Sequence, residues 1–156
     1  MMELEEALKF LRSKNSGERI EAILELGRIS NAGAVPALLK AVSDDETGAL
    51  ACWALGKIGD KAAVPKLLEC LASSDPQIRH EAALALGRIG DSRALKPLMK
   101  LMRTDYVAKV REECAEALAY FDSPESLRAL KAAAGEDKSK AVRDQAAKSV
   151  LALLSK

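Results

Sequence analysis

The sequence is poor in aromatic residues and carries no excess of charge of either sign. Phe, Trp and Tyr make up 3% of the 156 residues, too few for most β-sandwiches or for a surface that stacks nucleic-acid bases. The formal net charge of +1 gives no electrostatic basis for binding nucleic acid. A share of 49% hydrophobic residues excludes a disordered chain and predicts one folded domain over residues 1–156.

Long apolar runs and paired cysteines are also missing. No stretch approaches the roughly 18 apolar residues of a membrane span, and the N-terminal residues are acidic where a signal peptide is basic. Cys52, Cys70 and Cys114 lack CxxC spacing, which favours free thiols over disulfides or a zinc site. We therefore expect a soluble cytoplasmic protein without membrane contact and without a bound cofactor.

An internal repeat dominates what the sequence does contain. The segment IRHEAALALGRIGDSRALKP at 78–97 resembles TGALACWALGKIGDKAAVP at 47–65 and ERIEAILELGRISNAGAVP at 18–36. Gly27, Gly56 and Gly87 coincide at separations of 29 and 31 residues, and Ala119 takes the same place 32 residues further on. A period near 31 predicts a stack of units, none of which can bury its apolar face alone.

Each unit has the pattern of a helical hairpin. The first helix begins near a proline, as at Val64-Pro65, and the second, over Ile78 to Ile89, carries its apolar residues on one face. Asn31, Asp60 and Asp91 are N-cap candidates. The pattern predicts an all-α protein, an α-solenoid coiled as a right-handed superhelix, with five hairpins at about 3–29, 33–58, 62–89, 93–121 and 124–154.

The repeat resembles the HEAT-repeat family, and specifically the HEAT-like repeats of the phycobilisome-lyase type. The resemblance rests on Ile78-Arg79, Ala82-Ala83, Leu86-Gly87, Ile89-Gly90-Asp91, Ala94-Leu95 and Leu98. It implies that the second helices line a concave face. The family contains scaffolds, lyases and a metal-dependent hydroxylase, so the resemblance leaves the function open.

Periodicity also predicts which residues of the second helices point outward. Ile20, Leu24, Leu50, Trp53 and Leu84 are apolar where a solvated face is polar, and exposed apolar patches mark interaction sites. We predict a non-enzymatic scaffold, monomeric, that binds a protein or peptide. The predicted groove comprises Ile20, Leu24, Arg28, Leu50, Trp53, Lys57, His80, Glu81, Leu84, Arg88, Glu112, Glu113, Glu116 and Tyr120. The other interpretation is that strong curvature buries Leu24, Trp53 and Leu84 as ordinary core.

Catalytic alternatives rest mainly on His80, the only histidine. The segment around His80-Glu81 is similar to the His-Glu motifs of deoxyhypusine hydroxylase, a HEAT-like di-iron enzyme. The neighbouring units carry Ala49-Leu50 and Glu112-Glu113 at this place, so a multi-histidine iron shell is missing. We expect His80-Glu81 and the glutamates to be solvated surface residues without a metal. A phycobilin-lyase-like role is implied by the family alone.

Arginines recur at one position of the second helices, at Arg19, Arg79, Arg111 and Arg143. Each follows a helix-start residue (Asn15, Asp75, Asp105 and Asp137), which predicts a ladder of Asp–Arg contacts between successive repeats. The second unit has Thr47-Gly48 instead, and whether this gap loosens the stack is left open. In the fourth unit Tyr120-Phe121-Asp122 replaces the Gly-Asp turn, and we expect aromatic packing to fix that bend.

Overall fold

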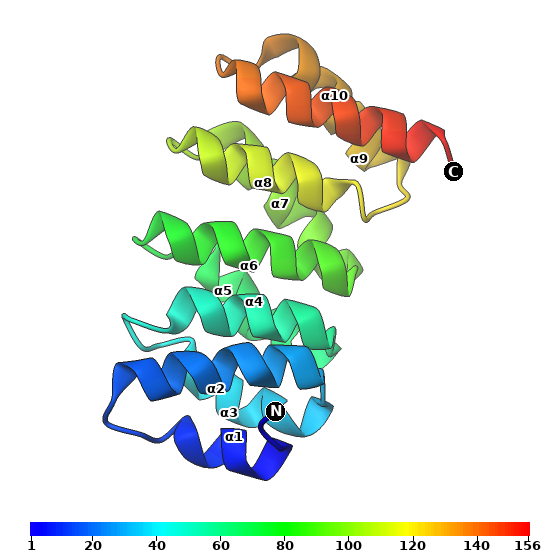
Figure 1. Cartoon of the computed structure of the whole chain (residues 1–156). Helices are drawn as coiled ribbons and strands as arrows, with labels where there is room; N and C mark the ends of the chain where they lie inside the picture. Colours follow the sequence, from blue (N-terminus) through cyan, green and yellow to red (C-terminus); the bar gives the residue numbers. More distant parts are fainter.

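The computed structural model describes residues 1–156 as ten α-helices that follow one another as antiparallel hairpins (Figure 1). The helices are α1 (Leu4–Phe10), α2 (Ser16–Ile29), α3 (Val35–Ala41), α4 (Gly48–Ile58), α5 (Val64–Cys70), α6 (Pro76–Ile89), α7 (Leu95–Thr104), α8 (Ala108–Leu118), α9 (Pro124–Glu136) and α10 (Lys140–Leu154). Short 3₁₀ turns at Ala32–Ala34, Lys61–Ala63 and Ser92–Ala94 lead into α3, α5 and α7. None of the helices is long and apolar enough to cross a bilayer.

The hairpins stack so that the helices form two layers. The even-numbered helices lie side by side like rungs, with α2 next to α4 and so on to α10, and the odd-numbered helices form the layer behind them (Figure 1). The predicted all-α solenoid is thereby confirmed.

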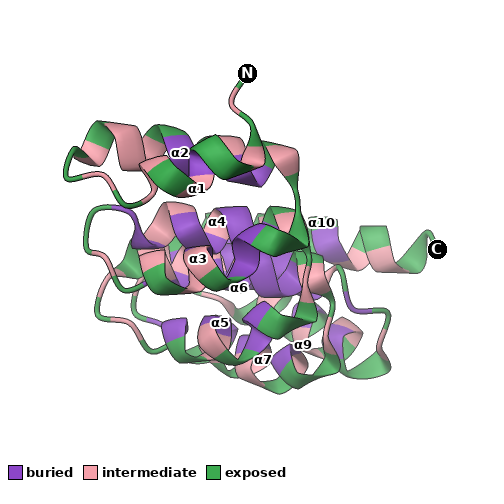
Figure 2. Ribbon diagram, turned by 90° about the horizontal axis from the view of Figure 1, so that it is seen from below, coloured by how far each residue is buried: buried purple, intermediate pink, exposed green.

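Residues at the repeated positions form the core between the layers. Every even helix except α10 contributes one leucine, and every odd helix except α1 contributes another. All of these side chains are fully buried: Leu26, Leu55, Leu86 and Leu118 from the even helices, and Leu38, Leu67, Leu98 and Leu130 from the odd helices. Viewed along the stack, buried residues gather where the layers face each other (Figure 2). Cores built from leucine and alanine explain why the sequence needs so few aromatic residues.

Polar caps and left-handed residues determine where the helices begin and end. The Asp75 carboxylate accepts a hydrogen bond from the Gln77 N–H at 2.8 Å and starts α6. Asp60, expected to cap α5, instead accepts from the Ala62 N–H and caps the 3₁₀ turn before it. Gly59 and Gly90 end α4 and α6 with φ of 76° and 68°, a conformation that costs glycine little.

Glycines allow the even helices to approach closely. A Cβ placed on Gly56 would lie 2.7 Å from the Cα of Ala85, and one on Gly87 would lie 2.8 Å from the Cα of Ala117. Neighbouring odd helices pack less extensively against each other. The repeats are therefore packed more closely on the even side than on the odd side, and the outward surface of the even helices is called the inner face below.

The predicted arginine ladder is present in the C-terminal repeats, where it joins the third repeat to the fourth and the fourth to the fifth. Arg79 donates to the Asp105 carboxylate through Nε at 2.7 Å and through Nη2 at 3.0 Å. Arg111 makes the same two bonds to Asp137 at 2.9 and 3.0 Å. Nη1 of each arginine also donates to a carbonyl oxygen of its own inter-helix turn, that of Ser73 or of Asp105. Each arginine therefore fixes a turn and the neighbouring repeat together.

The ladder is weaker toward the N-terminus. Arg19 pairs with the exposed Glu46 at 2.8 Å, whereas the second repeat carries Gly48 at the arginine position. A Cβ on Gly48 would lie 2.6 Å from the carbonyl oxygen of Val42, so the backbone leaves no room for a side chain there. The gap in the ladder is thus a consequence of a tight turn.

The bend between α8 and α9 shows one correct and one wrong expectation. Phe121 is buried, and its carbonyl oxygen accepts a hydrogen bond from the Ser126 hydroxyl at 2.8 Å. Tyr120 is 48% exposed and does not belong to the buried core. Only one of the two aromatic residues therefore fixes this turn.

Candidate binding surface

The inner face of the stack displays the apolar residues of the second helices only in part. Leu24 on α2 is 41% exposed, while Ile20, Leu50, Trp53 and Leu84 are half-buried. None of the five side chains belongs to the fully buried core, and none is fully exposed to solvent. The face therefore combines packing between repeats with a partly exposed apolar row.

Trp53 shows this double role most clearly. Its indole ring lies directly over Gly27 of the preceding repeat and occupies the space that a Cβ at that position would need. The ring also packs against the core while remaining half-buried. Trp53 thus packs on Gly27 as Ala85 packs on Gly56 and as Ala117 packs on Gly87. Its side chain is larger than alanine and also reaches the surface.

A hollow of about 460 Å³ opens beside Trp53. Leu24, Ala49 and Leu50 line it together with the indole ring, and Gln77 and Glu81 of α6 supply its polar wall. The hollow therefore offers an apolar floor with one carboxylate at its edge.

The glutamates of the fourth repeat do not form the solvated cluster that the sequence suggests. Glu113 is only 6% exposed, and its Oε2 lies 2.6 Å from Nε2 of His80. The Nδ1 atom of His80 lies 3.4 Å from Oε1 of Glu81. The expectation that His80 and Glu113 are ordinary surface residues is wrong, because the pair joins α6 to α8.

This pair changes the protonation of the histidine. The hydrogen bond to Glu113, assisted by Glu81, raises the pKa of His80 to about 9, although partial burial acts in the opposite direction. His80 is therefore positively charged at neutral pH and its positive charge is balanced by two carboxylates. No repeat pattern pointed to this contact, because His80 is the only histidine and the other repeats carry different residues at its position.

The remaining predicted residues divide between paired and free side chains. Arg28 pairs with Glu25 at 2.9 Å, and Glu112 pairs with Lys109 at 3.3 Å. Lys57, Arg88 and Glu116 are exposed and form no ion pair. The rim of the face thus keeps two free cations and one free carboxylate.

Tyr120 lies at the far end of the face and lines a second hollow. This hollow of about 400 Å³ is formed with Glu116 of α8 and with Gln145, Lys148 and Lys156 at the end of the chain. It shares no residue with the hollow beside Trp53. The structure therefore shows two separate depressions where the sequence suggested one continuous groove.

Reactive side chains do not gather into a catalytic arrangement. No group of three or more His, Cys, Asp or Glu side chains is placed to hold a metal ion. Burial raises the pKa of the Cys114 thiol, and all three cysteines are buried and free.

Comparisons with known proteins agree with the fold. A profile of HEAT repeats matches residues 4–75 and 43–119, and a profile of the PBS lyase HEAT-like repeat matches residues 110–136. No curated sequence matches the chain.

Among solved structures, the chain is similar to phycocyanin lyase from Nostoc sp. PCC7120, determined as the complex of CpcE and CpcF. The identity is 26% and the TM-score 0.84, over 100% of this chain and 66% of that chain. A designed armadillo repeat protein in complex with the peptide (KR)4 has 21% identity and a TM-score of 0.72, over 96% of this chain and 81% of the other. Human deoxyhypusine hydroxylase in complex with glycerol has 17% identity and a TM-score of 0.55, over 98% and 85%. The last two similarities concern the fold alone.

Proposed function

The chain belongs to the HEAT-repeat family, and from this premise we propose that it is a non-enzymatic scaffold that binds a segment of another protein on its inner face. The observation that carries the proposal is the hollow beside Trp53, where Leu24 and the indole ring remain partly exposed on an otherwise packed layer. Partly exposed apolar side chains around a depression mark interaction sites, and Trp is one of the residue types enriched in binding hot spots.

The lining of the hollow defines the chemistry of the ligand. An apolar side chain of the partner would enter beside Leu24 and Trp53. A cationic group would pair with Glu81 at the edge, whose contact with His80 is long, at 3.4 Å, and involves Oε1 alone. Glu113 is not available for this purpose because His80 already occupies it. The preferred ligand is therefore a segment with a large apolar residue next to Lys or Arg.

One of the similar structures supports a binding role, since the phycocyanin lyase structure is a complex between two protein chains. Because this chain spans 66% of the lyase chain, that similarity supports association with a protein without identifying the partner.

The proposal is tested with peptides selected by display on the wild-type protein. Leu24→Glu places a charge at the hollow on a residue that is already 41% exposed, so we expect the fold to survive and the dissociation constant to rise about tenfold or more. The matched control is Leu151→Glu, the same substitution at a 68% exposed leucine of α10 that does not line the hollow. Isothermal titration calorimetry of both variants measures the effect. Equal affinity for the wild type and Leu24→Glu would exclude the hollow as the binding site.

A phycobilin-lyase-like or chaperone role is the second candidate, and the 26% identity to the phycocyanin lyase over the full chain favours it. Such a role predicts that the protein perturbs the absorbance of an added bilin or accelerates its attachment to the phycocyanin apoprotein. Unchanged bilin spectra and attachment rates would eliminate it, while leaving the peptide test unaffected.

A further inference from the structure

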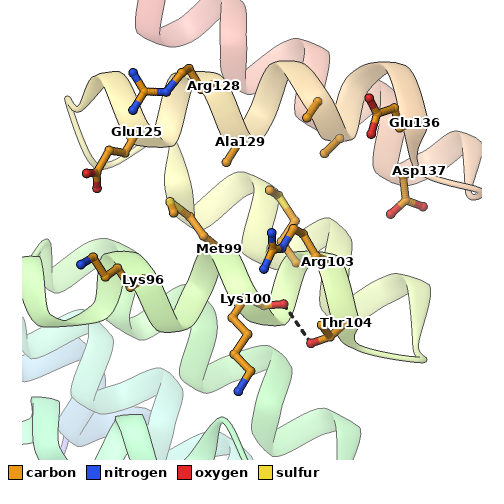
Figure 3. A pocket seen from close by; sticks show the side chains of 13 residues that line it. Lys96, Met99, Lys100, Arg103, Thr104, Glu125, Arg128, Ala129, Glu136 and Asp137 are labelled. Atoms are coloured by element: carbon orange, nitrogen blue, oxygen red, sulfur yellow. Dashed lines mark hydrogen bonds between the residues drawn. The ribbon is translucent and has the colours of Figure 1, made fainter.

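A larger depression lies on the opposite side of the molecule, between the odd helices α7 and α9. Its volume is about 1000 Å³, and it is separate from the inner face because it is formed by the first helices of the last two hairpins (Figure 3). The two helices that border it are the longest of their layer, with 10 residues in α7 and 13 in α9, against 7 in α5. The result is an elongated groove in the outer layer.

The floor of this groove is formed by apolar residues. Met99 of α7 and Ala129 of α9 point toward each other across the gap (Figure 3), and Ala132 and Ala133 continue the α9 wall. Small residues allow the backbone of a ligand to come close, and a methionine side chain adapts its shape to what it contacts. A floor of this kind suits a helix better than a rigid small molecule.

The edges of the groove are rich in unpaired positive charge. Four cations line it, namely Lys96, Lys100 and Arg103 on α7 and Arg128 on α9. None of the four forms an ion pair or donates a side-chain hydrogen bond within the chain. By contrast, the cationic side chains of the ladder are fully engaged, as Arg111 is with Asp137.

The acidic residues of the groove do not balance this charge. Glu125 stands at one end and Glu136 at the other (Figure 3). The third, Asp137, is already paired with Arg111. The groove therefore carries more free positive than free negative charge, in a protein whose formal net charge is only +1.

We propose that the groove between α7 and α9 binds an acidic amphipathic helix of another protein. Lys96, Lys100 and Arg103 follow the spacing i, i+4, i+7 and so lie along one side of α7 over about 10 Å. A helix laid beside α7 with Glu or Asp at the same spacing meets these cations in register, while its apolar face packs on Met99 and the α9 alanines. The proposal concerns a second surface and does not depend on the inner-face hollow.

The experiment uses a fluorescein-labelled helical peptide of about 14 residues, ~21 Å long, with Glu at i, i+4 and i+7 and with Leu and Ala on the adjoining face. Fluorescence anisotropy with the full chain is expected to show saturable binding that weakens as salt is raised. The double variant Lys96→Glu/Arg103→Glu is expected to weaken binding about tenfold or more. Ala132→Trp, which fills the groove at an exposed residue, is expected to weaken it as well.

Lys131→Glu is the matched control, since Lys131 is exposed on α9 but does not line the groove. Circular dichroism confirms that every variant is folded. The proposal is overturned if the peptide does not bind, if a peptide with Lys in place of Glu binds equally, or if Lys131→Glu weakens binding as much as the groove variants. It is also overturned if a second copy of the chain occupies the groove, which the double variant would reveal by abolishing self-association in light scattering.

Discussion

A single ionisable residue, His80, links two neighbouring repeats. Its imidazole lies 2.6 Å from the Glu113 carboxylate, and both side chains are largely removed from water. A buried carboxylate without a partner is costly, so each member of the pair requires the other. The protonation of His80 therefore contributes to how firmly α6 and α8 are joined.

We predict that this pair makes stability depend on pH on the alkaline side of neutrality. The pKa of His80 rises from its ordinary 6.5 to about 9 on folding. The stabilisation is thus fully present below 6.5 and is lost as the pH rises through 9. This rise in pKa corresponds to roughly 3 kcal/mol at full strength, and solvent screening of the partly exposed imidazole lowers the expected change to about 2 kcal/mol. Urea unfolding at several pH values between 6 and 10 measures it. His80→Gln supplies the comparison, and parallel pH profiles for the wild type and this variant would contradict the prediction.

At the scale of the helix, the arginine ladder predicts unequal effects of the same substitution. Arg79 is buried against Asp105; burial acts to raise the pKa of that carboxyl, but the bonds from Arg79 and from the Val107 N–H hold it below its ordinary value. Arg79→Ala leaves a buried charge unpaired, and we expect a loss of about 3–5 kcal/mol in the free energy of unfolding. Arg143 donates only to the Asp137 carbonyl, and we expect Arg143→Ala to cost about 1 kcal/mol.

Chemical denaturation of the two variants compares these losses directly. If both substitutions lower the free energy of unfolding equally, the paired hydrogen bonds from Arg79 to Asp105 stabilise the protein no more than the single bond of Arg143.

Close helix contact gives a second prediction for single elements. A methyl group at Gly87 would lie 2.8 Å from the Cα of Ala117, so Gly87→Ala should destabilise the protein by about 1–3 kcal/mol through overpacking. Gly135 in α9 has no neighbour within 4 Å at the same atom, and Gly135→Ala should stabilise by about 0.5–1 kcal/mol because alanine favours a helix. Thermal unfolding of the pair measures the contrast. A loss at Gly135 equal to that at Gly87 would mean that helix geometry, not contact with Ala117, decides the outcome.

Helix positions were predictable because each repeated residue has the same role in every unit. Leu86 and Leu118 are buried alike, and Asp105 and Asp137 accept arginines alike, so periodicity alone identified them. Contacts that occur once carry no such signal. His80 meets Glu113, and Trp53 covers Gly27, at positions where the other repeats have different residues. The sequence also did not predict the groove between α7 and α9. No motif marks it, and it lies beside α9, the longest helix of its layer.

For the whole molecule, the uneven ladder predicts an uneven resistance to unfolding. The buried Arg79–Asp105 and Arg111–Asp137 bonds lie in the C-terminal half, whereas the N-terminal bond of Arg19 joins the exposed Glu46 and contributes little. In a stack each repeat is supported mainly by its neighbours. We expect hydrogen–deuterium exchange to be fastest in α1 and α2 and slowest in α6 and α8. Uniform protection along the chain would show that the stack unfolds as a single unit instead.

The direction of the ladder has a consequence for how such an array can lengthen. Each internal rung takes its arginine from one hairpin and its aspartate from the turn of the next, as Arg79 does with Asp105 and Arg111 with Asp137. A duplicated copy of the segment that begins at Asp105 and ends before Asp137 would therefore carry an arginine that pairs with the following repeat and an aspartate that pairs with the preceding one. Tandem duplication in the gene preserves every pair without a compensating mutation, and the array can grow or shrink by whole repeats while its internal bonding stays complete.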